Sequence, residues 1–168
     1  MRSAIGGMLF VDEAYALVKD PKDTFGKEAL DTLIKLVEDH REDLVVVLAG
    51  YPREMDELLS HNPGVRSRFP TVIAFDDYTV DELEEIARAM LAKASMRLDD
   101  GAERALREHL ERVVRAGGAE SGNGRAVRNI VERALRAQAL RLANQGPEDL
   151  AGTISPDALC ELTEADIA

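Results

Sequence analysis

Two short runs of apolar residues near the start of the chain flank a segment with a helical pattern. Residues 8–12 (MLFVD) and 44–49 (LVVVLA) are continuous apolar runs rich in valine, which is typical of strands covered on both faces in a parallel sheet. Between them, residues 26–40 place apolar side chains on one helical face, namely Ala29, Leu30, Leu33, Leu36 and Val37. The order strand, helix, strand predicts a βαβ unit.

A third apolar run, residues 71–75 (TVIAF), follows a short helical segment near 52–60 and a link at 60–70 (SHNPGVRSRFP). The Asn-Pro-Gly sequence at 62–64 is expected to break helix, so the link is predicted to be irregular. Counting the third run as a strand, the pattern predicts an α/β fold with a parallel three-stranded sheet.

From Thr79 onward the pattern becomes helical. Thr79 and Glu82, three residues apart, form a capping-box sequence ahead of an amphipathic segment. Residues 99–115 and 125–144 carry apolar side chains at helical spacing, and 116–124 (AGGAESGNG) is the linker between them.

This change of pattern divides the chain into three predicted parts. Residues 1–77 form the α/β part, residues 78–146 a helical domain, and residues 147–168 a C-terminal tail. Two short helices are expected in the tail, Ser155 to Glu161 and Thr163 to Ile167, each opened by a capping residue.

Charge and composition exclude several classes of function. The formal net charge of -11 and the pI near 4.8 oppose binding to nucleic acid or to an anionic membrane. Residues 101–144 hold nine arginines against five acidic residues, yet no aromatic residue that could stack on bases. One cysteine, Cys160, excludes an internal disulfide, and no apolar stretch reaches the roughly 18 residues of a membrane span. A cytoplasmic protein without a nucleic-acid or membrane partner is expected.

The strongest chemical signal is the acidic pair Asp12-Glu13 at the end of the first predicted strand. Ligands of open parallel sheets bind beyond the carboxyl ends of the strands. An acid at that point can hold Mg²⁺, and its neighbour can polarise an attacking water. The pair therefore fits a Walker B motif, and the alternative is a strand that simply ends in a polar turn.

Three segments resemble the AAA+ ATPases, in particular the CbxX/CfqX group that includes Rubisco-activase-like proteins, stage V sporulation protein K-like proteins and type VII secretion ATPases. The segments, which run through most of positions 6–137, are "GGMLFVDEAYAL", "FGKEALDTLIKLVEDHREDLVVVLAGYPREMDELLSHNPGVRSRF" and "SGNGRAVRNIVERA". The resemblance implies a partial AAA+ core followed by a C-terminal helical lid, with ATP and Mg²⁺ as cofactors.

The resemblance also implies roles for residues at the strand ends. Asp12 would coordinate Mg²⁺ and Glu13 would activate water. Tyr51, which follows the second strand in the sequence Ala49-Gly50-Tyr51, lies where many AAA+ proteins have a polar sensor-1 residue. The alternative for Tyr51 is a partly buried aromatic side chain without contact to nucleotide.

Four arginines match positions of known importance in the family. By its position Arg68 corresponds best to the family's arginine finger, and Arg66 is the other choice. An arginine suits this role because its guanidinium offers a planar fork to phosphate oxygens. Arg125 matches the sensor-2 arginine of the lid, and Arg128 is the second choice. The alternatives are solvated surface arginines for the first pair and, for Arg128, a charge ladder with Glu132 and Arg136.

One expected motif does not occur in these 168 residues. AAA+ ATPases hold phosphates with a glycine-rich loop, G-x-x-x-x-G-K-[ST], and Gly26-Lys27-Glu28 is the nearest match, with Glu28 where Ser or Thr is required. We therefore expect no ATP hydrolysis by the chain alone. In the AAA+ strand order the family's first strand separates residues 44–49 from 71–75, so these two runs are expected to stand about 10 Å apart or to pair directly.

The resemblance implies a function for the intact ATPase. Subunits in a ring, a hexamer in this interpretation, would use ATP hydrolysis to remodel a protein client. The alternative is a catalytically inactive module that docks onto intact AAA+ subunits and supplies Arg68 as an arginine finger.

Overall fold

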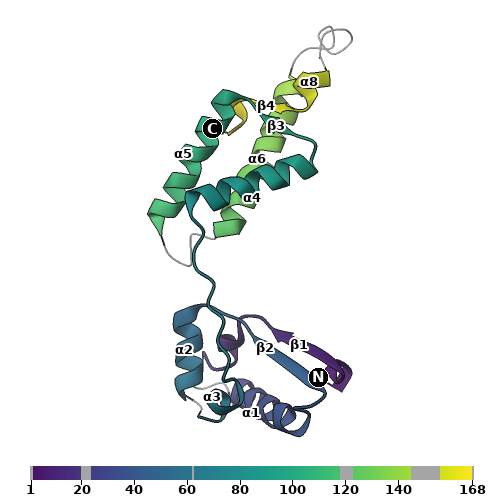
Figure 1. Cartoon of the computed structure of the whole chain (residues 1–168), viewed down its shortest axis with the longest axis vertical. Coiled ribbons are helices and arrows are strands. Elements are labelled where there is room, and N and C mark those ends of the chain that lie inside the picture. Colours follow the sequence, from purple (N-terminus) through teal and green to yellow (C-terminus); the bar gives the residue numbers. More distant parts are fainter. Residues whose placement is uncertain (1, 20–23, 62, 118–122, 145–155, 168) are drawn as a thin grey trace. The chain divides into compact units, whose positions relative to one another are not determined.

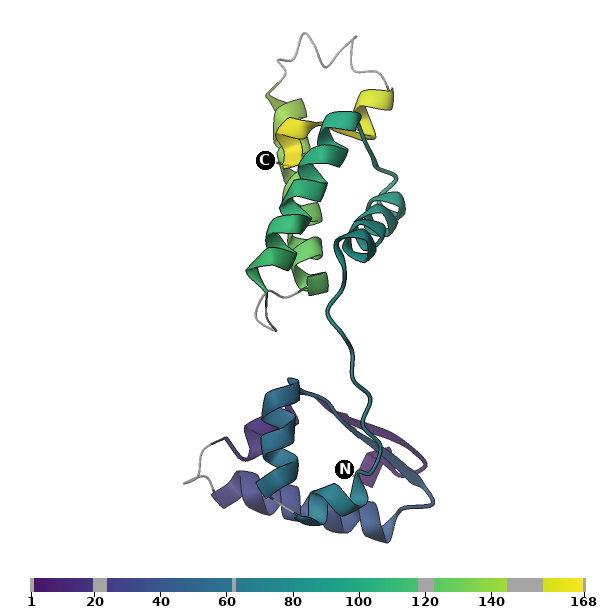
Figure 2. The same cartoon turned by 60° about the vertical axis from the view of Figure 1, so that its left-hand side comes forward.

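A computed structural model describes residues 2–19, 24–61, 63–117, 123–144 and 156–167. The chain forms two compact units, Met1–Phe75 and Asp76–Ala168. Figures 1 and 2 show the elements of each unit from two directions. Each unit is described here by itself.

The first unit combines a small sheet with helices. Its elements, in chain order, are η1 (Arg2–Ala4), β1 (Gly7–Val11), η2 (Ala14–Leu17), α1 (Thr24–Asp39), β2 (Leu44–Leu48), α2 (Pro52–His61) and α3 (Pro63–Arg68). Strands β1 and β2 pair in parallel, with a register that runs from Gly7 opposite Leu44 to Val11 opposite Leu48. The predicted βαβ unit is therefore confirmed.

The predicted three-stranded sheet is wrong. Residues 71–75 form no strand, and the described part of the chain contains two two-stranded sheets instead. Their apolar side chains lie in solvent, and Phe75 is 90% exposed. The run has the composition of a buried strand, but a strand also needs the edge of a neighbouring strand to supply its hydrogen bonds, and residues 71–75 pair with neither β1 nor β2. Direct pairing with residues 44–49 therefore does not occur.

The predicted irregular link after α2 is also wrong, because residues 63–68 form helix α3. Pro63 is the first residue of this helix, a position at which proline is favoured because the missing N–H would have no partner there. Pro63 and Gly64 thus open a second helix instead of an irregular link.

One face of the β1–β2 sheet packs on the helices. Buried Ala14, Leu30, Leu58 and Val65 come from η2, α1, α2 and α3, and the partly buried Val11, Leu48 and Phe69 pack against them. The opposite face is open: Met8, Phe10 and Val45 are 62%, 59% and 55% exposed. Because side chains alternate along a strand and Met8 lies opposite Val45, these three residues share one face. We call them the open sheet face.

The second unit is largely helical. Its elements are α4 (Val80–Lys93), β3 (Arg97–Leu98), α5 (Asp100–Ala116), α6 (Asn123–Ala143), α8 (Pro156–Leu159), β4 (Glu161–Leu162) and α9 (Glu164–Ile167). Strands β3 and β4 form a two-residue parallel pair that the sequence pattern did not predict. Helices α4, α5 and α6 contact one another, and α9 contacts α5 and α6, around one apolar core. This core includes Leu83, Leu106, Leu110, Val127, Ile130 and Leu162.

Side-chain caps fix where α4 and α5 begin. Thr79 caps α4 with the complete capping box, because its hydroxyl accepts from the Glu82 N–H at 3.3 Å and its own N–H donates to Glu82 Oε2 at 2.8 Å. Asp99 caps α5 by accepting from the Ala102 N–H at 2.6 Å. The capping box predicted from the sequence is confirmed.

Polar cross-links fasten the last described residues to α6. The Arg141 guanidinium donates to both carboxylate oxygens of Asp166, at 2.9 and 2.7 Å, and the Asp166 side chain is only 1% exposed. Thr163 donates to the same carboxylate from its N–H and hydroxyl. Gln138 Nε2 donates to the carbonyl of Leu159 at 2.9 Å. Residues 159–166 are therefore held against α6 by side-chain hydrogen bonds.

Among the described residues, no helix has both the length and the apolar character needed to cross a membrane.

Candidate functional site

The acidic pair lies directly beyond the carboxyl end of β1. Val11, the last strand residue, and Ala14, which is 1% exposed, both belong to the core on the helical side. Asp12 and Glu13 between them are exposed. The two buried anchors thus hold the turn in place and leave both carboxylates in solvent.

Glu13 has an unusual backbone conformation. Its φ and ψ are 50° and 41°, in the left-handed region, which is uncommon for a residue other than glycine. The Asp12 carboxylate accepts from the Glu13 N–H at 3.0 Å through Oδ1. This hydrogen bond and the burial of Ala14 maintain the turn in which Glu13 lies.

Hydrogen bonds join the ends of the two strands at this point. The Ala49 N–H donates to the Val11 carbonyl at 2.9 Å, and the Ala14 N–H donates to the Ala49 carbonyl at 3.0 Å. These bonds bring the sequence Ala49-Gly50-Tyr51 after β2 beside the acidic turn. Asp12, Glu13 and Tyr51, predicted as site residues, therefore belong to the same end of one sheet.

Gly50 fits this place because no side chain can be accommodated. A Cβ atom there would lie 2.7 Å from Tyr15 Cδ1 and 2.8 Å from Met55 Sδ. The rings of Tyr15 and Tyr51 pack beside each other, with centroids 6.2 Å apart at 33°. Tyr51 itself is 38% exposed, so its environment is that of a ring packed on one side and open on the other.

The region around Tyr15 carries negative charge. Burial, the largest cause, raises the pKa of the Tyr15 hydroxyl above its usual range, and electrostatic repulsion from Glu13, Tyr51, Glu54 and Asp12 raises it further. Tyr15 and Glu54 were not predicted as site residues. The sequence offers no signal for them, because only the folded turn places Tyr15 between the strand ends and α2.

The donor set fits a magnesium ion that is shared with another ligand. Asp12 Oδ2 and the Glu13 carboxylate make no hydrogen bond within the described ranges, so both offer free oxygen atoms. Among the described residues no group of three or more His, Cys, Asp or Glu side chains could hold a metal. One or two carboxylates together with phosphate oxygens and water is the usual ligand set of Mg²⁺ in nucleotide sites.

Arg68 is held against its own unit. It is the last residue of α3, and its Nε lies 3.1 Å from Glu38 Oε2 on α1. One terminal nitrogen donates to the Gly64 carbonyl at 3.3 Å. The Arg68 side chain is 31% exposed and that of Glu38 52%, but the Arg68 Nε atom itself is buried. Arg66 on the same helix is exposed.

Arg125 and Arg128 belong to the second unit, in the first turns of α6. Both are exposed, and neither makes a hydrogen bond or ion pair with another residue of the described part of the chain. Glu132 pairs with Arg136 at 3.3 Å, so the charge ladder considered from the sequence includes only its second step. Asn123 is the first residue of α6, and its side-chain amide donates to the carboxylate of Asp77.

The second unit matches a known domain family. Residues 79–168 match the family described as the AAA lid domain.

Curated proteins are similar over a larger part of the chain. Stage V sporulation protein K of Bacillus subtilis is 46% identical over 84% of this chain and 44% of its own length. Protein CbxX of Cupriavidus necator is 39% identical over 99% of this chain and 51% of its own. The chloroplastic ribulose bisphosphate carboxylase/oxygenase activase of Cyanidioschyzon merolae is 39% identical over 99% of this chain and 54% of its own. The chain thus spans about half the length of these relatives.

Proposed function

Because the chain belongs to the AAA lid domain family and to the CbxX-like AAA+ ATPases, we propose that it acts in an ATPase that couples ATP hydrolysis to remodelling of a protein client. The working unit in this proposal is a ring of such subunits, a hexamer, in the cytoplasm.

The observation that carries the proposal is the exposed acidic pair beyond β1. Asp12 offers a free carboxylate oxygen for Mg²⁺, and Glu13 offers a carboxylate that can orient and polarise an attacking water. Bound Mg²⁺ would neutralise charge on the phosphates during transfer. The packed Tyr15 and Tyr51 rings support the turn from the β2 side, so we assign Tyr51 to the wall of the nucleotide site.

We assign the arginines to contacts with the bound nucleotide. Arg68 serves as the arginine finger for a neighbouring subunit. Reaching a phosphate requires Arg68 to give up its pair with Glu38 and its hydrogen bond to the Gly64 carbonyl, and hydrogen bonds to phosphate oxygens would replace them. Arg125, with Arg128 as second choice, contacts nucleotide from the lid, and both guanidinium groups are free of partners within the described residues.

The test joins these 168 residues behind the N-terminal part of a relative that carries a glycine-rich phosphate loop. We expect Mg²⁺-dependent ATP hydrolysis by this chimera. Glu13→Gln should lower turnover by about 10²-fold or more, because it removes the base that polarises water, while nucleotide still binds. Glu42→Gln, an exposed acid in the turn before β2, is the control and should leave turnover unchanged. Full turnover in the Glu13→Gln chimera would refute the assignment.

A second function is favoured by the open sheet face. Met8, Phe10 and Val45 are exposed together, and both strands of the sheet have a free edge among the described residues. Exposed apolar patches and unpaired edges are typical of surfaces that bind another chain. The alternative is therefore a module without catalysis of its own that docks onto intact AAA+ subunits and supplies Arg68.

Mixing the chain with an intact relative tests this alternative. If the module docks, the ATPase rate of the relative changes in proportion to added chain, and Arg68→Ala removes that change. Arg66→Ala, on the same short helix but exposed, should retain it. An ATPase rate that stays constant at every ratio would exclude docking.

A further inference from the structure

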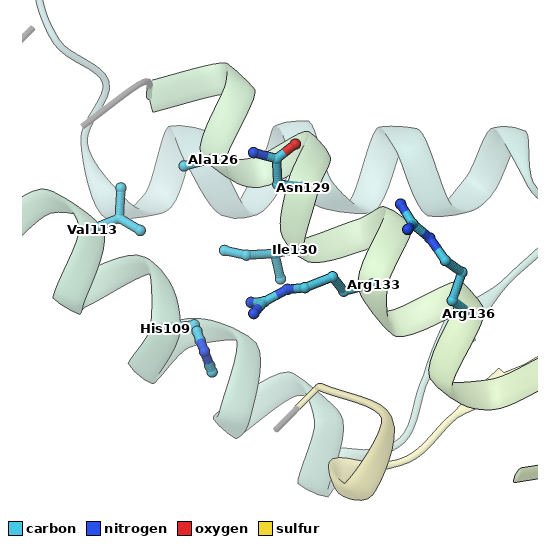
Figure 3. Close-up of a pocket in the computed structure, with 7 residues that line it drawn as sticks. All are labelled: His109, Val113, Ala126, Asn129, Ile130, Arg133 and Arg136. Carbon is cyan, nitrogen blue, oxygen red and sulfur yellow. The ribbon is translucent and has the colours of Figure 1, made fainter. Parts of the chain in front are cut away.

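A pocket of about 490 Å³ opens between α5 and α6 in the helical unit. Its apolar wall is formed by Val113, Ala126 and Ile130. Its polar groups are His109 of α5 and Asn129, Arg133 and Arg136 of α6. Figure 3 shows the Arg133 side chain extending from α6 towards α5, beside Ile130, with His109 on the α5 side. The hollow is largely open to solvent, and its lining combines apolar surface with a few polar side chains.

Positive groups surround the imidazole in this pocket. One terminal nitrogen of Arg112 lies 2.9 Å from His109 Nδ1. Burial, followed by the charges of Arg112 and Arg133, lowers the pKa of His109. The hydrogen bond with the Ala105 backbone and the negative charge of Glu108 raise this pKa, but they offset the lowering only in part. These causes favour the neutral imidazole, so the guanidinium groups carry the positive charge of the pocket.

Arg133 is available to a ligand. It makes no hydrogen bond or ion pair with any residue of the described ranges, whereas Arg136 at the rim pairs with Glu132 at 3.3 Å. Helix α6 carries five arginines and one acidic residue, Glu132, in a chain with a net charge of -11. An unpaired guanidinium next to apolar surface, in a protein that is otherwise acidic, marks a local preference for anions.

We propose that this pocket binds a small phosphomonoester with an apolar body, and that Arg133 is the residue that binds the phosphate. The planar fork of a guanidinium matches two phosphate oxygens. Asn129 is a further donor at the pocket wall, and Val113, Ala126 and Ile130 would cover the apolar body. The site is built from α5 and α6 alone, so it is distinct from the acidic pair that follows β1.

Phenyl phosphate and inorganic phosphate are suitable probes for the full chain. The chain has three histidines, His40, His61 and His109, so ring signals of isotopically labelled histidine report binding at one position. We expect saturable shifts of the His109 signals and a higher His109 pKa in the complex, because a bound dianion stabilises the imidazolium. Calorimetry should give at least fivefold tighter binding for phenyl phosphate than for inorganic phosphate or for benzoate.

Variants separate the pocket from a general charge effect. Arg133→Ala should weaken phenyl phosphate at least tenfold, and Arg133→Lys, which keeps the charge but loses the fork, should give an intermediate loss. Arg104→Ala removes an exposed arginine of α5 that lies outside the pocket and should bind as the unsubstituted chain does.

Three results would overturn the proposal: His109 signals that do not move, equal effects of Arg133→Ala and Arg104→Ala, or equal affinity for phenyl phosphate and benzoate. Because none of these measurements uses ATP hydrolysis, the outcome is independent of the proposed ATPase function.

Discussion

At the scale of single residues, the acidic turn combines backbone strain with exposure. Glu13 lies in the left-handed region, and its side chain makes no capping hydrogen bond. Conformations of this kind persist where the surrounding structure determines them, and they are concentrated at functional sites. Burial of Ala14 and the Asp12 hydrogen bond provide that determination here.

Glu13→Gly should therefore stabilise the protein. Glycine adopts positive φ without steric penalty, and removing the strain at Glu13 should raise the free energy of unfolding by about 0.5–1 kcal/mol. Urea denaturation followed by circular dichroism measures the change. Glu42→Gly, at a position with negative φ, should instead destabilise slightly, because glycine increases the entropy of the unfolded chain. A loss of stability in Glu13→Gly would show that the side chain itself supports the turn.

At the scale of elements, local patterns predicted what local chemistry determines. The capping box at Thr79 and the helical spacing of 99–115 depend on residues close in sequence, and both are confirmed. The strand assigned to 71–75 is wrong because its composition indicates burial but cannot supply a neighbouring strand edge. The pairing of Arg97–Leu98 with Glu161–Leu162 joins segments far apart in the chain, so no local pattern indicated it.

The candidate site shows the same division. The acidic pair could be predicted because it follows an apolar strand directly. Tyr15 and the arginine pocket of α6 could not, since their neighbours come from other elements: Tyr15 meets Tyr51 after β2, and Arg133 faces His109 of α5. Spacing along one helix could at most place Asn129, Arg133 and Arg136 on one flank of α6.

The capping box of α4 gives a prediction with a defined pH dependence. Thr79→Ala should lower the free energy of unfolding by about 1 kcal/mol, as measured by urea denaturation. The backbone and side-chain hydrogen bonds of Thr79 lower the pKa of Glu82. A lowered carboxyl pKa stabilises the fold above the usual glutamate value of about 4.3, and this contribution is lost as the pH falls through the lowered pKa.

The control for this cap is Thr71→Ala, which changes an exposed threonine outside any helix and should alter stability little. The difference between the Thr79 variant and the unsubstituted chain should shrink below pH 4 as Glu82 is protonated in both. A constant difference down to pH 2.5 would contradict the role of the Glu82 carboxylate.

The docking of α9 depends on Asp166. Removing one partner of a buried ion pair leaves the other charge without compensation. Asp166→Asn should therefore destabilise the protein by about 2–4 kcal/mol. This value lies towards the lower end of the range for buried pairs because the Arg141 side chain is partly exposed. Burial raises the pKa of Asp166, but the hydrogen bonds from Arg141 and Thr163 outweigh it and hold the pKa below its usual range. This stabilisation is present above the usual aspartate pKa and is lost as the pH falls below it.

Amide hydrogen exchange measures the Asp166→Asn effect locally. Faster exchange is expected first at the Asp99 N–H, which donates to the Leu162 carbonyl, and at the Arg97 N–H, which donates to the Cys160 carbonyl. Glu164→Gln, which changes an exposed acid in the same helix, is the matched control. Unchanged exchange at both amides in the Asp166 variant would show that apolar contacts of Leu162 and Ile167 suffice to hold the segment.

At the scale of the whole molecule, the open sheet face determines how the chain behaves in solution. Its three apolar residues lie on a two-stranded sheet, and Val72, Ile73 and Phe75 add further exposed apolar side chains in the same unit. A sheet of two strands is marginally stable without further cover.

We therefore expect the 168-residue chain to self-associate. Apolar surface and free strand edges should bring copies together in a concentration-dependent way, and sedimentation velocity should detect species larger than 18.4 kDa that grow with concentration. Replacing Phe10 and Val45 together by lysine should shift the distribution towards monomer, because charges on that face oppose stacking of sheets. Leu140→Lys combined with Val114→Lys, at exposed apolar positions of the helical unit, is the matched control and should leave association unchanged. If the unsubstituted chain sediments as a monomer at all concentrations and melts cooperatively, the open sheet face does not mediate association. The docking alternative then loses its main support.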